Sequence, residues 1–159
     1  MTTPLHKASY EGHADAIRLL IDHGAEVNAK AKNGMTPLHW ASWRRHTDAT
    51  VILIDNGADV DAKNTCGETV LHYASYKGHI NTMALLIDHG ANANKKGNNG
   101  ETALHYASRK GHVDAIKILT ENGADVNDKD RWDITPLRVA SLNGHTDAIA
   151  LLKEHGAIE

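Results

Sequence analysis

Residues 101–129 read ETALHYASRKGHVDAIKILTENGADVNDK, and the rest of the chain is built from copies of this stretch. A step of 33 residues from Thr102 or Leu104 always reaches the same residue type, at Thr3, Thr36, Thr69 and Thr135 and at Leu5, Leu38, Leu71 and Leu137. Six further columns keep one residue type in all five copies, those of Ala107, Ser108, His112, Leu119, Gly123 and Ala124. A constant interval of this length predicts a stack of repeated supersecondary units.

Each copy predicts a helix, a turn, a second helix and a loop. Thr102 is suited to cap the first helix, and in three copies the threonine precedes a proline, which is favoured at the first helical position. Gly111 can adopt the positive φ that ends this helix, and Gly123 ends the second helix in the same way. Ile116 and Leu119 share one face of the second helix, so this face is expected to be buried.

Motifs within the copies resemble the signature of ankyrin repeats. The threonine motif reads TPLH at residues 3–6 and 36–39, with TVLH, TALH and TPLR in the other copies, and GADVN or a variant follows the second helix. The resemblance covers essentially all 159 residues. It implies an all-α repeat solenoid of stacked helix-turn-helix units, with β-hairpin loops (fingers) projecting at one edge and a concave surface formed by fingers and first helices. The repeats fall at about 1–30, 31–63, 64–96, 97–129 and 130–159, and residues 1–159 are predicted to form a single domain.

Composition restricts the classes of function. The net charge of −3 and the pI near 6.4 argue against general attraction to nucleic acid. The single cysteine, Cys66, excludes an internal disulfide and fits a reducing compartment. No apolar run is long enough to span a bilayer, and no signal peptide follows Met1. We therefore expect an intracellular, cytoplasmic monomer that does not enter a membrane.

Some copies depart from the pattern. The first begins at its helix cap without a preceding finger or a polar outer face, which suggests excision from a longer array. In the second, Arg45 replaces the helix-ending glycine and Thr50 replaces an isoleucine, so we expect backbone strain and a buried hydroxyl that needs a partner. In the last, Asp133 replaces the finger glycine and Arg138 a histidine, and its turn is expected to differ.

The histidines, glycines and cysteine predict no catalytic, metal or cofactor site. The twelve histidines fall mainly into two repeating columns and a third group at the second-helix ends, where they are expected to bond the cap threonine, neighbouring backbone groups or the last helical carbonyls. Zinc requires converging ligands, whereas residues one repeat apart lie about 10 Å from each other. Almost all glycines belong to turn columns, and Cys66 lies near a finger tip. The resemblance also implies that Asn28, Asn94 and Asn127 are candidate sites of asparagine hydroxylation.

The positions outside the repeating columns predict a partner-binding surface. In ankyrin proteins, the finger tips and the ends of the first helices contact partners, and here these positions are rich in aromatic and basic residues, which favour binding hot spots. The predicted binding residues are Tyr10, Lys32, Met35, Trp43, Arg44, Tyr76, Lys77, Arg109, Lys110, Arg131, Trp132, Ile134 and Leu142.

The favoured function is a non-catalytic protein–protein interaction module whose partner offers acidic and apolar groups on an amphipathic helix or an extended loop. The first alternative is single-stranded nucleic-acid binding through aromatic and basic residues, which the acidic total charge disfavours. An enzyme is a more distant alternative. A structural interpretation also stays open, in which the aromatic residues shield neighbouring helices and the lysines keep the surface soluble. Trp40, Tyr73 and Tyr106 form a separate column, expected to pack between first helices.

Overall fold

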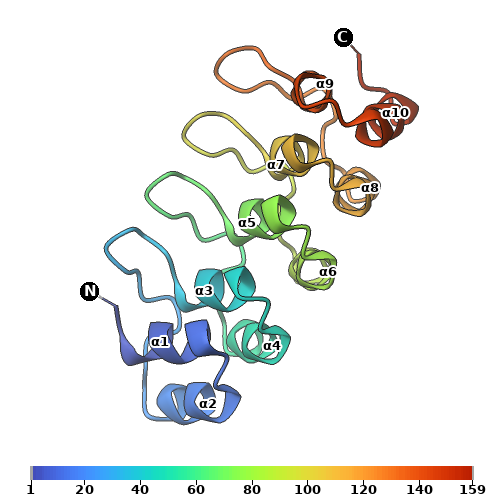
Figure 1. Ribbon diagram of the computed structural model, residues 1–159. Helices are drawn as coiled ribbons and strands as arrows, with labels where there is room; N and C mark the ends of the chain where they lie inside the picture. The colour runs from blue at the N-terminus through green and yellow to red at the C-terminus, as the bar shows by residue number, and fades with distance from the viewer. Residues whose placement is uncertain (1, 159) are drawn as a thin grey trace.

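The computed structural model describes residues 2–158 as a linear stack of helix pairs (Figure 1). Each pair with its loop is one unit, numbered here from the N-terminal end, and the described residues contain five pairs. The odd-numbered first helices form one layer and the second helices another. Their bounds are α1 Pro4–Glu11, α2 Ala14–Asp22, α3 Pro37–Trp43, α4 Thr47–Asp55, α5 Val70–Lys77, α6 Ile80–Asp88, α7 Ala103–Lys110, α8 Val113–Glu121, α9 Pro136–Leu142 and α10 Thr146–Glu154. The predicted all-α repeat solenoid is confirmed.

The first helices begin at a threonine and a histidine that cap each other. The Thr36 amide donates to Nδ1 of His39 at 3.1 Å, and the opposite ring nitrogen, Nε2, lies 3.4 Å from the Glu68 carbonyl oxygen in the next unit. Because an amide only donates and a carbonyl only accepts, the ring is neutral with its proton on Nε2. One side chain therefore caps its own helix and also holds the following unit.

The same contact recurs along the stack. His6, His72 and His105 bond their cap threonines and reach carbonyl oxygens of the next unit at 3.0–3.1 Å. This confirms the predicted structural role of the column. Arg138 occupies the corresponding place in α9, and a guanidinium cannot accept a hydrogen bond, so only the Thr135 side chain caps that helix.

A second histidine column joins each unit to the preceding one. Nε2 of His46, His112 and His145 lies 3.0–3.1 Å from the carbonyl oxygens of Tyr10, Tyr76 and Arg109. His79 differs, because its Nδ1 bonds the Ser42 carbonyl oxygen at 3.1 Å.

Arg45 explains the exception at His79. It has φ 63°, as the sequence predicts, and occupies the place that glycine fills in the other units. A Cβ atom added to Gly12 or Gly111 would lie 2.5–2.6 Å from the next unit's histidine ring. At Gly78 the corresponding distance is 3.1 Å, so we infer that the Cβ of Arg45 crowds the ring of His79, which bonds a different carbonyl oxygen.

The core runs continuously between the two helix layers. Leucines and alanines of the repeating columns are buried at every level, including Leu38, Leu71 and Leu104 at 0–1 % exposure. Thr50 is buried among them, and its hydroxyl donates to the His46 carbonyl oxygen at 2.9 Å. The buried hydroxyl thus has the partner that the sequence required.

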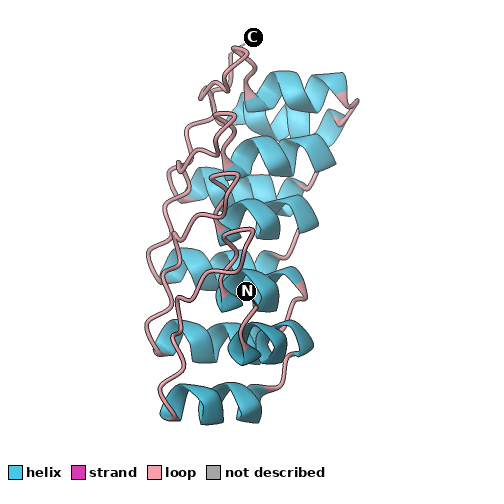
Figure 2. Ribbon diagram, turned by 90° about the vertical axis from the view of Figure 1, so that its left-hand side faces the viewer, coloured by secondary structure: helices cyan, strands magenta, loops and turns pink. Residues whose placement is uncertain are grey.

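The finger loops, residues 31–35, 64–68, 97–101 and 130–134, project along one side of the stack (Figure 2). Among residues 2–158 they contain no β-strand. Each loop is closed by a backbone bond such as Asn64 N to Glu68 O at 3.0 Å, and one bond, such as Thr65 N to Asn33 O at 3.0 Å, links neighbouring fingers. The projecting loops are confirmed, but they are turns rather than paired strands.

The prediction that the last finger turns differently is wrong. Asp133 has φ 64°, in the left-handed region of its glycine counterparts, and Asp130 N bonds Ile134 O at 3.0 Å as in the other fingers. A Cβ at Gly34 would lie 2.6 Å from the Thr65 amide of the next finger. No described finger follows Asp133, so its Cβ meets no such neighbour, and aspartate tolerates this conformation better than most residues.

No helix within residues 2–158 combines the length and apolar character needed to cross a bilayer.

Candidate interaction surface

The surface between the finger loops and the first helices, here called the inner surface, carries two columns of aromatic side chains that interleave. Edge-to-face pairs join Tyr10 to Trp40, with ring centroids 5.6 Å apart, and Trp43 to Tyr73 at 5.4 Å. Tyr76 and Tyr106 form a third pair at 6.2 Å. Each pair connects adjacent units. The sequence separated these residues into a binding column and a packing column, whereas the structure packs them against each other.

Cations cover the rings of the Tyr10 column. The Arg44 guanidinium lies 4.7 Å from the Tyr10 ring centroid, the Lys77 ammonium 4.2 Å from that of Trp43, and the Lys110 ammonium 4.5 Å from that of Tyr76. Every cation belongs to the unit after its ring. These residues, Tyr10, Trp43, Tyr76, Arg44, Lys77 and Lys110, are called the aromatic–cation row below.

The row presents positive charge to solvent. Arg44, Lys77 and Lys110 are exposed, and within the described residues none of them forms an ion pair with a carboxylate. A hydrogen bond from the Lys110 ammonium lowers the pKa of the Tyr76 hydroxyl, aided by the positive charge itself. The rings are only partly buried, so apolar surface remains beside the cations.

Two finger carboxylates contact residues next to the row. Glu101 is 3 % exposed and pairs with Arg109. Glu68 accepts hydrogen bonds from the hydroxyls of Tyr106 and Tyr73 at 2.5 and 2.8 Å. Burial alone would raise the pKa of Glu68, but the hydrogen bonds from Tyr106, Asn64 and Tyr73 outweigh it and hold the pKa below its usual range. Glu68 is therefore ionised near neutral pH.

The sequence placed Glu68 and Glu101 at finger positions of the predicted contact surface but did not include them among the predicted binding residues, although their column gave a signal. The corresponding residues in the other fingers are Met35 and Ile134, so a carboxylate stands where other units place an apolar side chain. Met35 was predicted to bind a partner, but its side chain is only 6 % exposed and offers little surface for contact. Burial varies within the column, since Met35 and Glu101 are buried whereas Glu68 and Ile134 are only partly buried.

Among the other predicted binding residues, cation–ring contacts are made by Arg109, Arg131 and Trp132. No such contact is recorded within the described residues for Lys32, Ile134 and Leu142. Arg109 is tied to Glu101 and lies over the Tyr106 ring, with its guanidinium 5.4 Å from the ring centroid. Trp132 is 62 % exposed on the last finger, with the Arg131 guanidinium 5.7 Å from its ring centroid. Placed apart from the aromatic–cation row are Lys32, exposed on the first finger, Ile134, partly buried, and Leu142, 66 % exposed at the end of α9.

The three asparagines that the family resemblance indicates as candidate hydroxylation sites hold neighbouring units together. The Asn28 amide donates to the Gly57 carbonyl oxygen at 2.9 Å and its oxygen accepts from the Asp59 amide at 2.8 Å. Asn94 and Asn127 make the corresponding pairs of contacts in later units. Their hydroxylation stays a prediction.

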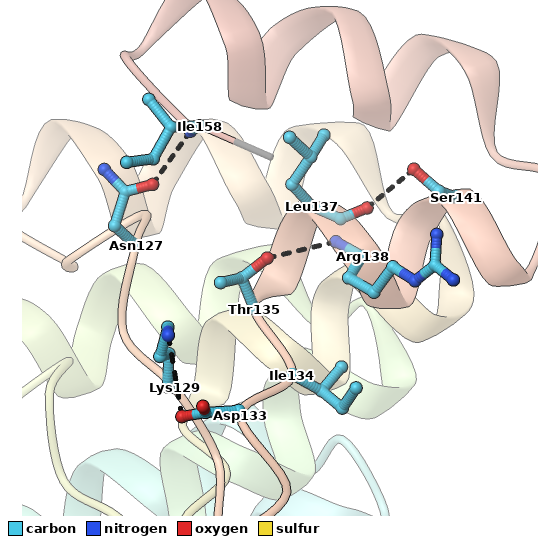
Figure 3. Close-up of a pocket in the computed structure, with 9 residues that line it drawn as sticks. All are labelled: Asn127, Lys129, Asp133, Ile134, Thr135, Leu137, Arg138, Ser141 and Ile158. Carbon is cyan, nitrogen blue, oxygen red and sulfur yellow. Dashed lines mark hydrogen bonds and ion pairs between the residues drawn. The ribbon is translucent and has the colours of Figure 1, made fainter.

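A cavity of about 570 Å³ lies at the C-terminal end of the stack (Figure 3). In Figure 3, Asn127 and Ile158 lie on one side, while Lys129 and Asp133 face each other at 3.5 Å. The lining residues are Asn127, Lys129, Asp133, Ile134, Thr135, Leu137, Arg138, Ser141 and Ile158. In the preceding unit, the counterparts Lys96 and His105 of the lining residues Lys129 and Arg138 bond the following unit, so the cavity lies where no further described unit covers the last one.

No group of three or more histidine, cysteine, aspartate or glutamate side chains in residues 2–158 is arranged to hold a metal ion. Cys66 is a free thiol, exposed on its finger.

Comparison with known proteins agrees with the fold. Residues 1–64 and 50–130 match a family model described as ankyrin repeats in three copies, and residues 109–152 match one described as ankyrin repeats in many copies. A 27-residue segment is 63 % identical to ankyrin repeat domain-containing protein 49 of Bos taurus. The match spans 17 % of this chain and 11 % of the bovine protein.

Proposed function

Because the chain belongs to the ankyrin repeat family, whose repeats generally serve as protein–protein interaction modules, we propose that it binds a partner protein through its inner surface. The family is typically non-catalytic, and we propose that this chain also acts by binding rather than by catalysis. We further propose a single-domain monomer that works in the reducing interior of the cell, which its exposed free thiol supports.

The observation that carries this proposal is the aromatic–cation row. The histidine, asparagine, leucine and alanine columns are engaged in stacking one unit on the next, so they are not free to select a partner. The row instead places three exposed cations and partly exposed rings side by side on consecutive units. Aromatic and arginine side chains dominate the binding energy of protein interfaces.

The charge of the row favours acidic partner segments. Its three cations lack carboxylate partners within the described residues, so acidic side chains can approach them without breaking an existing ion pair. The ring edges beside them favour apolar groups. The partner segment is therefore acidic on one side and apolar next to it.

Single-stranded nucleic acid is the second candidate, and the geometry disfavours it. Bases stack on open aromatic faces. Here the faces of Tyr10, Trp43 and Tyr76 carry cations at 4.2–4.7 Å, so stacking would have to displace them. A steep fall of affinity for single strands with added salt would indicate nucleic-acid binding instead.

The proposal is tested by affinity capture from a lysate of the host organism, followed by affinity measurement with the purified partner. Trp43→Ala combined with Arg44→Ala removes one ring and one cation of the row, and we expect binding to weaken by about 2–4 kcal/mol with an unchanged helical circular dichroism signal. Arg18→Ala with Leu19→Ala, on exposed positions of α2, is the matched control and should retain full affinity. Equal affinities of both variants would place the binding site elsewhere.

A further inference from the structure

We propose that the partner segment is an α-helix lying along the stack, with acidic residues at seven-residue intervals that pair with Arg44, Lys77 and Lys110. This inference rests on the proposed function and specifies the geometry of the partner. It excludes an extended strand as the bound conformation.

The three cations recur at the same place in three consecutive units. Arg44 follows α3 directly, and Lys77 and Lys110 end α5 and α7, so each charge has the same place in its unit. Each head group lies 4.2–4.7 Å from the ring centroid of the preceding unit, and these rings are themselves held in edge-to-face pairs. The charges are therefore ordered before a partner arrives, which lowers the entropic cost of binding them.

The distance between the charges selects the partner's conformation. Packed helices lie about 8–10 Å apart, so consecutive cations are spaced by about this distance. Seven residues of an α-helix rise about 10.5 Å and return to nearly the same face, which matches. Residues on one face of a β-strand are spaced by about 6.6 or 13 Å, which does not.

A polyproline II segment requires a separate argument, because its every third residue recurs on one face after about 9.3 Å. Such a segment supplies one narrow row of side chains. The surface offers two kinds of contact, the exposed cations and the partly buried rings of Tyr10, Trp43 and Tyr76 beside them. An α-helix fills both, because residues three and four positions after each acid lie on the neighbouring strip of its face.

The remaining units limit the length and suggest a direction. The same column holds Glu11 in the first unit and Asn143 in the last, so only three consecutive units offer a cation there. Acids at positions i, i+7 and i+14 of the partner cover these units over about 21 Å. A basic residue one further interval along would face Glu11.

The test uses three fluorescent peptides and anisotropy titration with the whole chain. The first is a 22-residue stapled helix with glutamates at its positions 4, 11 and 18 and leucines beside them. The second has the same composition with glutamates at positions 4, 9 and 14, and the third is a proline-rich peptide with aspartate at every third position. We expect the first to bind at least about tenfold more tightly than the others.

Three variants of the protein test the register. Lys77→Ala should weaken binding of the first peptide about tenfold, whereas Lys117→Ala, an exposed lysine on α8, should leave it unchanged. Lys77→Glu should abolish binding, and a peptide with lysine at position 11 should restore it.

The outcomes separate this inference from the proposed function. Equal binding of the first two peptides, tighter binding of the proline-rich one, or failure of the charge exchange overturns the helical geometry. If capture of the natural partner still depends on Trp43 and Arg44, the proposed function stands without it. Loss of both results overturns the proposed function as well.

Discussion

At the scale of single residues, Arg45 occupies a strained backbone conformation. A non-glycine residue at φ 63° costs about 1 kcal/mol, and its Cβ also forces His79 to a different carbonyl oxygen. We expect Arg45→Gly to raise the free energy of unfolding by about 1–2 kcal/mol. Urea denaturation followed by circular dichroism measures this change.

Asp133→Gly is the matched control for this prediction. Asp133 has nearly the same φ, but among the described residues no later unit lies against it. We expect a gain clearly smaller than that of Arg45→Gly. Equal gains in the free energy of unfolding would mean that backbone conformation alone accounts for the effect. The changed hydrogen bond of His79 would then contribute nothing to stability.

A second residue-scale prediction concerns buried serines. The hydroxyl of Ser108 is buried without a hydrogen-bond partner among the described residues, and such a group costs about 1–3 kcal/mol. Ser108→Ala keeps the shape and removes the unpaired hydroxyl, so we expect thermal unfolding at a higher temperature. Ser75→Ala should gain less, because the Ser75 hydroxyl contacts the Met83 sulfur at 3.8 Å. A destabilised Ser108→Ala variant would contradict this interpretation.

At the scale of elements, the histidine caps make the first helices sensitive to acid. Burial lowers the pKa of His39 to about 4, and burial also lowers the pKa of His6, His72 and His105. These rings are neutral when folded, while the unfolded chain takes up protons below about pH 6.5. Their contribution is fully present above pH 6.5 and is lost as the pH falls toward 4, on the order of 3 kcal/mol for His39.

The pH prediction is tested by replacing one cap. A glutamine at position 39 can also accept from the Thr36 amide, but it does not titrate. We expect His39→Gln to be less stable at pH 7.5 and to lose less stability between pH 6.5 and 4 than the parent chain. His89→Gln, at an exposed helix end, is the control. An unchanged pH dependence in His39→Gln would show that other groups govern acid unfolding.

The helices and their caps could be predicted because each follows from local sequence repeated at a fixed interval. Thr36, Pro37 and His39 specify a helix start wherever they occur together. The turn at Asp133 was predicted incorrectly because residue type was taken as decisive. The closing backbone bond of the finger keeps the same geometry without glycine.

The inner surface was harder to predict, because its contacts cross from one unit to another. The sequence placed Trp43 beside Arg44 as neighbours on one helix, whereas Trp43 lies under Lys77 of the next unit. The burial of Met35 depends on how a finger folds back onto its helix. Such contacts join residues about one repeat apart, and no single motif contains both partners.

At the scale of the whole molecule, the stack repeats one set of contacts at each junction. Lysines at the finger bases show this regularity, since Lys30, Lys63 and Lys96 each donate to the carbonyl oxygen of the lysine 33 residues later, at 2.8–3.1 Å. Stability is then approximately a sum of unit and junction terms. A junction with altered contacts is therefore the place where the stack separates most easily.

The altered junction joins the second and third units, where Arg45 is strained and His79 bonds a different carbonyl oxygen. Opening there leaves α1–α4, a fragment of two units, while repeat stacks need about three units for stability. We therefore expect amides of α1–α4 to exchange hydrogen faster than those of α5–α8, measured by mass spectrometry under native conditions. Arg45→Gly should slow exchange in α1–α4 selectively. Equal protection of the α1–α4 and α5–α8 amides from exchange in the parent chain would contradict the weak junction. A stack with uniform junctions opens from its ends instead.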